Sequence, residues 1–366
     1  MESIKNLATQ IRGVSYKPQD LHDSLDDDSV ILLRANNIDE GKINFDDVVF
    51  VDKRKVAKEQ YLVAGDILIC ASSGSKQLVG KAASVDFDRP CTFGAFCKVI
   101  RPKQGLEKYL GVYFQSNKYR ETISSLSIGA NINNIRNEHI DSLVLPSYDD
   151  ISRQSIVNKI EKIINIIGLR KIQLSKLDQL IKARFVEFFG MPITNIKEWK
   201  TEPMNEVAPT MNYSGTFDEK IWLLNLDMIE AQTGRIIDYL YVTKNEVGNS
   251  TCTFDTSNVL YSKLRPYLNK VVVPDRCGYA TSELVPLQPV PSKLNREYLA
   301  YMLRSDEFVN MINEKVAGAK MPRVSMGDFR NFKVPIPPME LQKQFADFVK
   351  QVDKSKFGVI KGNRFF

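Results

Sequence analysis

The sequence predicts an α/β (α+β) protein that contains one domain twice. Each copy has mixed β-sheets and helices, and the copies are separated by long helices that form a coiled coil. Two observations predict this: a long internal repeat, and two segments whose apolar residues follow heptad spacing. The length of 366 residues allows two or three domains, and 43% hydrophobic with 26% charged residues is typical of a folded globular chain.

The repeat joins two segments at one constant offset and without a gap. Residues 109–146 align with residues 298–335, and within them Gly129-Ala130 matches Gly318-Ala319. Shorter matches follow upstream, at offsets that drift by a few positions. A fixed offset in the framework with drifting offsets in the loops indicates a duplication followed by loop divergence.

Short apolar runs bounded by Gly, Asn and Asp predict the strands of the first copy. We expect these strands at Val30–Ala35, Asp47–Val51, Asp66–Ala71, Gly80–Asp86 and Ala95–Arg101. An amphipathic helix should follow at Glu107–Ser116 and continue to about Ser125, before a loop at Gly129–Arg136 and a last strand at Ser142–Leu145. The second copy should repeat this order, with a helix near Arg296–Glu314 and a loop at Gly318–Ser325.

A long helix should follow each copy. The first begins at Asp149 or Asp150, which are suitable N-caps, and about 38 residues at ~1.5 Å each would reach ~57 Å. Pro337-Pro338 suits the start of the second helix. We expect the two helices to pack on each other, the alternative being two separate surface helices. The predicted seam consists of Ile156, Ile160, Ile163, Ile167, Leu174, Leu177 and Ile181 in the first helix, with Leu341, Phe345, Phe348 and Val352 in the second.

The sequence predicts no catalytic and no metal-binding residues. Its two histidines, His22 and His139, are not spaced as metal ligands, and its five cysteines never occur as C-x-x-C. The segment Gly74–Ala82 resembles a phosphate-binding P-loop, but the spacing of its glycines is wrong and Ala82 replaces the magnesium-binding hydroxyl, so a basic turn is the better interpretation. No signal peptide or membrane-length apolar run is present, so we expect a cytoplasmic protein with reduced thiols and no membrane contact.

Polar and basic loops at matching places in the two copies favour contact with DNA. Asn and Arg side chains bind base edges and Lys binds phosphate, and the net charge of +6 permits an anionic partner. The predicted DNA-facing residues are Ser73, Ser75, Lys76, Gln77, Asn131, Asn133, Asn134 and Arg136 in the first copy, and Lys263, Arg265, Tyr267, Lys320, Arg323 and Ser325 in the second.

The order of four motifs resembles the specificity subunits of type I restriction-modification systems. These motifs are Leu33–Ile43, Ala64–Gly74, Tyr109–Ser116 and the ending Val334-Pro335-Ile336-Pro337-Pro338-Met339-Glu340-Leu341-Gln342. The resemblance implies two target recognition domains, at residues 1–148 and 191–337, each reading one half of a bipartite target in double-stranded DNA. It also implies that a central helical region at 149–190 and a C-terminal one at 338–366 pack as an antiparallel coiled coil and space these domains about one DNA turn (~34 Å) apart.

The resemblance further implies partners that carry the chemistry. Adenine-methylating modification subunits, expected to be two, would dock on the helices, and restriction subunits with motor and nuclease activity would join them. S-adenosylmethionine, ATP and magnesium would be bound by these partners and none by this chain.

One departure from the family's pattern leaves alternatives open. The apolar spacing fades after Val352, so we expect a C-terminal helix shorter than the central one. The alternatives to a DNA-reading subunit are an assembly or decoy protein that binds modification subunits without reading DNA, and a DNA methyltransferase with unrecognised motifs.

Overall fold

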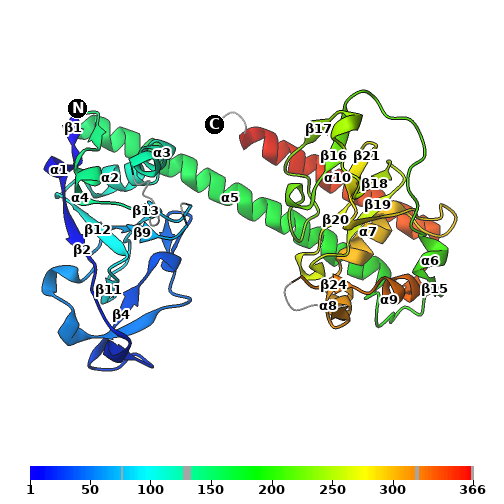
Figure 1. Cartoon of the computed structure of the whole chain (residues 1–366), viewed down its shortest axis with the longest axis horizontal. Coiled ribbons are helices and arrows are strands. Elements are labelled where there is room, and N and C mark those ends of the chain that lie inside the picture. The colour runs from blue at the N-terminus through cyan, green and yellow to red at the C-terminus, as the bar shows by residue number, and fades with distance from the viewer. Residues whose placement is uncertain (76, 127–132, 318–320, 364–366) are drawn as a thin grey trace. The chain divides into compact units, whose positions relative to one another are not determined.

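The computed structural model describes residues 1–75, 77–126, 133–317 and 321–363 (Figure 1). The chain divides into two compact units, Met1–Ile166 and Ile167–Phe366. Each unit holds one β-rich domain and one part of the long helix α5 (Asp150–Phe189), which is green in Figure 1. The predicted fold class is confirmed, because the structure has two β-rich domains and two long helices in contact.

The first unit contains two four-stranded sheets. One is antiparallel throughout, in the order β10 (Ala82–Ser84), β8 (Ile67–Cys70), β12 (Cys97–Pro102) and β2 (Ala8–Arg12). The other has the order β11 (Cys91–Phe93), β4 (Ser29–Leu33), β7 (Val49–Asp52) and β3 (Leu21–His22), with β11 and β4 parallel. The shorter elements of this unit are β1 (Glu2–Ser3), α1 (Ile4–Leu7), β5 (Ile38–Asp39), β6 (Lys42–Ile43), β9 (Ser72–Ser73), α2 (Glu107–Phe114), α3 (Asn117–Leu126), β13 (Asn133–Asn134), α4 (Asn137–Asp141) and β14 (Val144–Leu145).

The second unit repeats this arrangement. An antiparallel sheet has the order β20 (Val271–Val272), β19 (Val259–Ser262) and β22 (Leu284–Leu287). The other sheet has the order β17 (Leu240–Val242), β16 (Ile221–Leu224), β21 (Gly278–Thr281) and β18 (Thr251–Phe254), and β16 and β21 are parallel, as β4 and β11 are. The shorter elements are β15 (Thr201–Pro203), α6 (Met204–Val207), α7 (Arg296–Arg304), α8 (Asp306–Asn313), β23 (Val316–Ala317), β24 (Arg323–Val324), α9 (Met326–Asn331) and β25 (Lys333–Pro335).

Equivalent hydrogen bonds occur at equivalent positions of the two units. The hydroxyl of Tyr109 donates to the carbonyl of Pro146 at 3.2 Å, and that of Tyr298 donates to the carbonyl of Pro335 at 2.9 Å. Ser305 caps α8 and divides the helical segment predicted at Arg296–Glu314 into α7 and α8. These positions correspond under the constant offset of the internal repeat, so the repeat is structural as well as sequential.

Helix α5 begins as the sequence predicts. The Asp149 carboxylate accepts a hydrogen bond from the backbone N–H of Ser152 at 2.7 Å, and this bond holds the pKa of Asp149 below its usual range. Val157 is buried in the core of the first unit, Ile156 packs against that core, and Ile160 is half-buried.

In the second unit, α5 packs antiparallel on α10 (Met339–Asn363). The ring of Phe345 lies 5.5 Å from that of Phe185 and 5.4 Å from that of Phe189, while further along α10 Lys356 pairs with Asp178 at 2.6 Å. The predicted seam positions of this region lie at or beside the contact: Ile181, Phe345 and Val352 are buried, Leu177, Leu341 and Phe348 pack against the same core, and Leu174 is half-buried.

The middle of α5 does not follow the seam prediction. Ile163 and Ile167 are 37% and 40% exposed. Helix α10 has 25 residues and α5 has 40. Because the two helices contact each other at Phe345 and Phe189, near the start of α10 and the end of α5, the described contacts of α10 do not extend as far as Ile163 and Ile167. At these two positions the predicted packing against a second helix is absent in the described part of the chain.

Replacement of Phe345 by alanine should destabilise the second unit by about 3–5 kcal/mol, because Phe345 is fully buried among three aromatic rings. Urea unfolding followed by tryptophan fluorescence measures this, since Trp199 and Trp222 are the only tryptophans of the chain and both lie in the second unit. The exposed Leu180 on α5 is the control, and Leu180→Ala should change stability by less than about 0.5 kcal/mol. Equal losses in the two variants would contradict the packing described.

Replacement of Glu202 by glutamine should reduce the loss of stability in acid. Lys200 and Lys293 donate hydrogen bonds to the Glu202 carboxylate at 2.7 and 2.6 Å, and they lower its pKa to about 2. A pKa lower in the folded than in the unfolded chain stabilises the fold at neutral pH, and that stabilisation disappears as the pH falls from about 4.5 towards 2. Urea unfolding at pH 7 and pH 3 should show a smaller difference for Glu202→Gln than for the natural chain, and identical differences would refute the assignment.

Candidate nucleic-acid interface

In the first unit, the two predicted DNA-facing loops are joined by backbone hydrogen bonds. Strand β9 pairs with β13, so Ser72 lies opposite Asn134, and the N–H of Ile135 donates to the carbonyl of Ala71 at 2.8 Å. A turn between β11 and β12 adds a third segment, because the N–H groups of Ala71 and Ser72 both donate to the carbonyl of Phe96, at 2.9 and 3.0 Å. Three segments that are distant in the sequence therefore form one surface.

The second unit builds the same surface from equivalent residues. The N–H of Lys263 donates to the carbonyl of Glu283 at 3.0 Å, and the carbonyl of Lys263 accepts from the N–H of Val324 at 2.9 Å. The N–H of Arg265 donates to Pro322 at 2.8 Å. We call each arrangement the three-segment platform, made of residues 71–73, 94–97 and 133–135 in the first unit and of residues 263–265, 281–284 and 322–324 in the second.

The predicted residues of the first unit lie on or beside its platform. Asn134 and Arg136 are exposed, and the Arg136 guanidinium lies 3.6 Å from the Glu138 carboxylate. The Ser73 hydroxyl accepts from the N–H of Ser75 at 3.2 Å. The other predicted positions are Asn133, whose backbone pairs with Ser73, Ser75 and Gln77, which are exposed, and Lys76 and Asn131, which lie outside the described residues.

The segment Gly74–Ala82 leads into the strand β10 and not into a helix. Arg120 holds it by donating to the backbone carbonyls of Val79 and Gln77 at 2.7 and 2.8 Å. A P-loop needs a helix N-terminus after its glycines to bind phosphate, so this segment is a turn on the domain and not a nucleotide site.

In the second unit, Arg323 is the predicted residue with the most defined geometry. Its guanidinium pairs with the Glu283 carboxylate at 2.9 Å, and this pairing raises the pKa of Arg323. Arg265 is exposed and has a left-handed backbone (φ 49°), which costs about 1–3 kcal/mol in a non-glycine residue and persists only where the surroundings impose it. Of the remaining predicted positions, Lys263 is half-buried, Tyr267 is exposed, Ser325 caps α9 through its hydroxyl, and Lys320 lies outside the described residues.

Sequence reasoning missed the third segment of each platform. Phe96 and Glu283 each precede a strand and stand in a turn of the chain, where no charge cluster or amide run marks them. The sequence therefore has no signal for this segment. The feature that distinguishes Phe96, an exposed ring between two buried strands, is known only from the structure.

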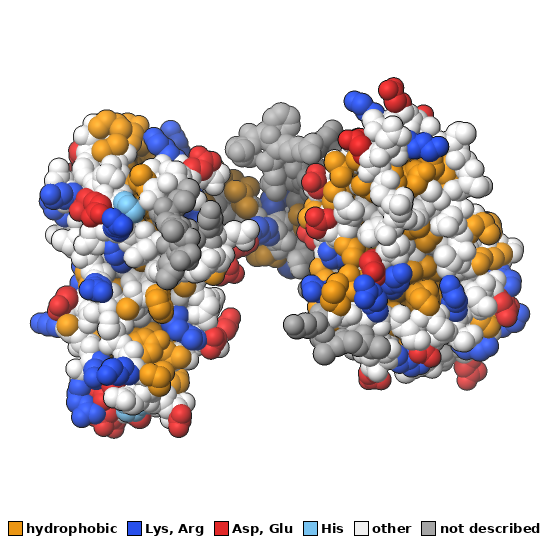
Figure 2. Space-filling view, in the orientation of Figure 1, with side chains coloured by type: hydrophobic (Ala, Val, Ile, Leu, Met, Phe, Trp, Pro, Cys, Tyr) orange, Lys and Arg blue, Asp and Glu red, His pale blue; other side chains and the backbone are white. Residues whose placement is uncertain are grey.

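Charge on the molecular surface is mixed. Figure 2 shows Lys and Arg side chains spread over the face in view, with Asp and Glu among them. No single basic field is therefore seen among the described residues of that face.

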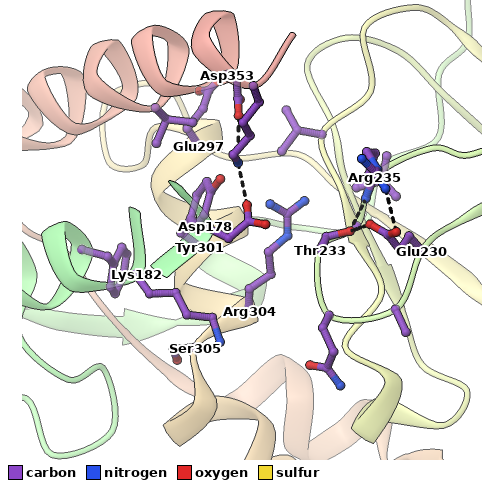
Figure 3. Close-up of a pocket in the computed structure, with 18 of the residues that line it drawn as sticks. Asp178, Lys182, Glu230, Thr233, Arg235, Glu297, Tyr301, Arg304, Ser305 and Asp353 are labelled. Atoms are coloured by element: carbon purple, nitrogen blue, oxygen red, sulfur yellow. Dashed lines mark hydrogen bonds and ion pairs between the residues drawn. The ribbon is translucent and has the colours of Figure 1, made fainter. Parts of the chain in front are cut away.

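A cavity of about 1030 Å³ in the second unit is lined by charged groups that pair with one another (Figure 3). Lys356 bridges Asp178 and Asp353, and Arg235 pairs with Glu230 at 2.7 Å. The buried Arg304 donates to the backbone carbonyl of Val271. The cavity is therefore a polar joint between α5, α7 and α10.

The histidines and cysteines have structural surroundings. His22 pairs with Asp26 at 2.8 Å, and Cys70, Cys91 and Cys97 are buried free thiols, so that desolvation raises the pKa of Cys91 to about 12. The described residues contain no group of three or more His, Cys, Asp or Glu side chains able to hold a metal ion. Within the same described ranges, no helix has the length and apolarity needed to span a membrane.

Comparison with known proteins shows which family the chain is similar to. The sequence profile of the type I restriction modification DNA specificity domain matches residues 227–364. The type I restriction enzyme EcoKI specificity subunit of Escherichia coli (strain K12) is 34% identical over 379 residues, which cover 96% of this chain and 80% of that protein. The StySPI specificity subunit of Salmonella potsdam is 38% identical over 180 residues, or 49% of this chain and 39% of that protein.

Two solved structures share the fold. The S subunit of a type I restriction-modification system from M. genitalium matches with a TM-score of 0.51 and 13% identity, covering 99% of this chain and 91% of that one. A chain from a study of complex assembly and conformational transition in the type I R-M system matches with a TM-score of 0.52 and 16% identity, covering 97% and 93%. The similarity to the EcoKI subunit spans almost the whole chain and most of that protein, and the protein is therefore a member of the specificity subunits of type I restriction-modification systems, the non-catalytic subunits that determine the DNA target.

Proposed function

We propose that each three-segment platform reads one half of a bipartite target in double-stranded DNA. In this proposal residues 1–148 and 191–337 are the two target recognition domains. The observation that carries it is the pairing of the same three segments in both domains with different side chains upon them: Ser and Asn in the first, and Lys, Arg and Glu in the second. A shared backbone frame with divergent polar groups is what two readers of different sequences require.

We further propose that the regions 149–190 and 338–366 space the readers and dock the modification subunits. The middle of α5 supports docking, because its apolar side chains are exposed and a partner could cover them. These side chains are Ile163, Ile164, Ile166, Ile167, Leu169 and Ile172. In this assembly, S-adenosylmethionine is bound by two modification subunits, and ATP and magnesium are used by restriction subunits.

The test is a long-read methylome of cells that express this chain with its modification subunit. A split, asymmetric motif methylated at adenines on both strands supports two working readers. A palindromic motif with one half repeated would show that only one platform reads DNA. Unmethylated DNA beside an intact complex would favour an assembly protein that does not read DNA.

Alanine at Asn134 or at Arg323 should change recognition in one half-site only. A lost bidentate contact costs about 1–3 kcal/mol of discrimination at the base concerned. Methylation rates on duplexes with single base changes in each half measure the effect. Ser305→Ala is the control, since loss of the α8 cap should lower stability without changing base preference. Effects of Asn134→Ala or Arg323→Ala on both halves would indicate misfolding and contradict the assignment.

Aspartate at Ile163 should prevent assembly with the modification subunits while leaving the isolated chain folded. Ile163 is already exposed, so a charge there costs the free chain little but would be buried without a partner in the complex. Mass measurement of the reconstituted complex, with thermal unfolding of the free subunit, separates the two effects. Ile163→Leu keeps the apolar surface and should assemble normally, and a complex of full mass with Ile163→Asp would refute docking at this site.

A further inference from the structure

Phe96 is 71% exposed, more than any other aromatic side chain whose exposure the structure describes. A single exposed apolar residue is ordinary on protein surfaces. The position of Phe96 is not ordinary, because it belongs to the platform of the first domain, beside the segment that carries Ser73 and Asn134.

The backbone of Phe96 is held in place. The N–H of Cys97 donates to the carbonyl of Gly94 at 2.8 Å, which closes the turn, and the Phe96 carbonyl accepts the two N–H groups of Ala71 and Ser72. Cys97 and Gly94 on either side are buried. These bonds fix the backbone of Phe96 at the surface, where its apolar ring is exposed to water, and a ligand that covers the ring gains the free energy of apolar burial.

The equivalent position of the second domain is Glu283. Its carbonyl accepts the N–H of Lys263, as the carbonyl of Phe96 accepts that of Ala71, and its carboxylate binds the guanidinium of Arg323. The same turn therefore presents an apolar ring in one domain and an acid that orients a predicted reading residue in the other.

We propose that this turn is a third reading segment, in which Phe96 contacts a base of the half-site read by the first domain. The inference rests on the proposed function. A phenylalanine ring interacts with DNA bases by packing on a thymine methyl group or by stacking on an unstacked base. Glu283 has the corresponding role in the second domain and positions Arg323.

The experiment uses the complex reconstituted from this chain and its modification subunits, with duplexes in which each base pair of the target is changed in turn. Phe96→Ala should lower affinity for the intact target about 5- to 150-fold and should abolish discrimination at one or two adjacent base pairs of one half-site. The dependence of affinity on salt should keep its slope, because Phe96 neutralises no phosphate. Leu25→Ala, at another exposed apolar residue of the first unit, is the matched control and should change neither quantity.

Two probes distinguish the forms of contact. Uracil in place of each thymine removes the methyl group alone. If Phe96 packs on that methyl, uracil at one position weakens the natural chain but not Phe96→Ala, and Phe96→Leu retains binding. If Phe96 stacks, Phe96→Leu loses binding as Phe96→Ala does. In the second domain, Glu283→Gln should change discrimination only in the other half-site.

Other results overturn the inference. Phe96→Ala with natural discrimination at every base pair would show that the ring faces no base. Loss of complex assembly in Phe96→Ala, with the subunit still folded, would assign Phe96 to a protein contact. A natural complex that discriminates at no base pair would instead refute the proposed function itself, so the two failures are distinguishable.

Discussion

The candidate interface of each domain depends on one backbone contact between segments that are far apart in the chain. In the first domain the N–H of Ile135 donates to Ala71, and in the second the N–H of Val324 donates to Lys263. Each contact joins the segment that follows one strand of the antiparallel sheet, β8 or β19, to a segment that follows two consecutive helices. These helices are α2 and α3 in the first domain, and α7 and α8 in the second. Main-chain groups make these bonds, so they do not specify the side chains presented on the surface. The two domains can therefore share a frame and differ in what they contact.

The long helices follow a different rule, because their contacts are made by side chains. The rings of Phe185, Phe189 and Phe345 pack together, and Asp178 pairs with Lys356 further along. Where α10 ends its described contacts, the apolar residues of α5 meet solvent. Helix α5 thus contributes buried side chains to the core of the second unit and exposes apolar side chains beyond that core.

Much of this structure could be predicted from the sequence. The sequence repeat predicts the two similar domains. Local signals predict the helix that begins after Asp149 and the helix after Pro337-Pro338. Strand β11 was missed because its three residues are all buried and show no alternation of apolar and polar side chains. Its parallel pairing with β4 joins residues that are far apart in the sequence. The exposure of Phe96 and the pairing of Arg323 with Glu283 depend on which segments meet in space, which periodicity does not encode. For the same reason, the heptad pattern at Ile163 and Ile167 predicted a partner helix, and no helix covers these two side chains within the described part of the chain.

The exposed side chains of the platforms have a consequence for how the protein varies. Asn134 and Arg136 are exposed, and the frame beneath them is held by main-chain bonds. Exchanges at such surface positions usually change folding free energy by less than about 0.5 kcal/mol. Cellular quality control responds to unfolded chains and not to altered contacts with a ligand. A subunit whose target has changed would therefore accumulate to the same level as its parent, and neither its abundance nor its solubility would reveal the change.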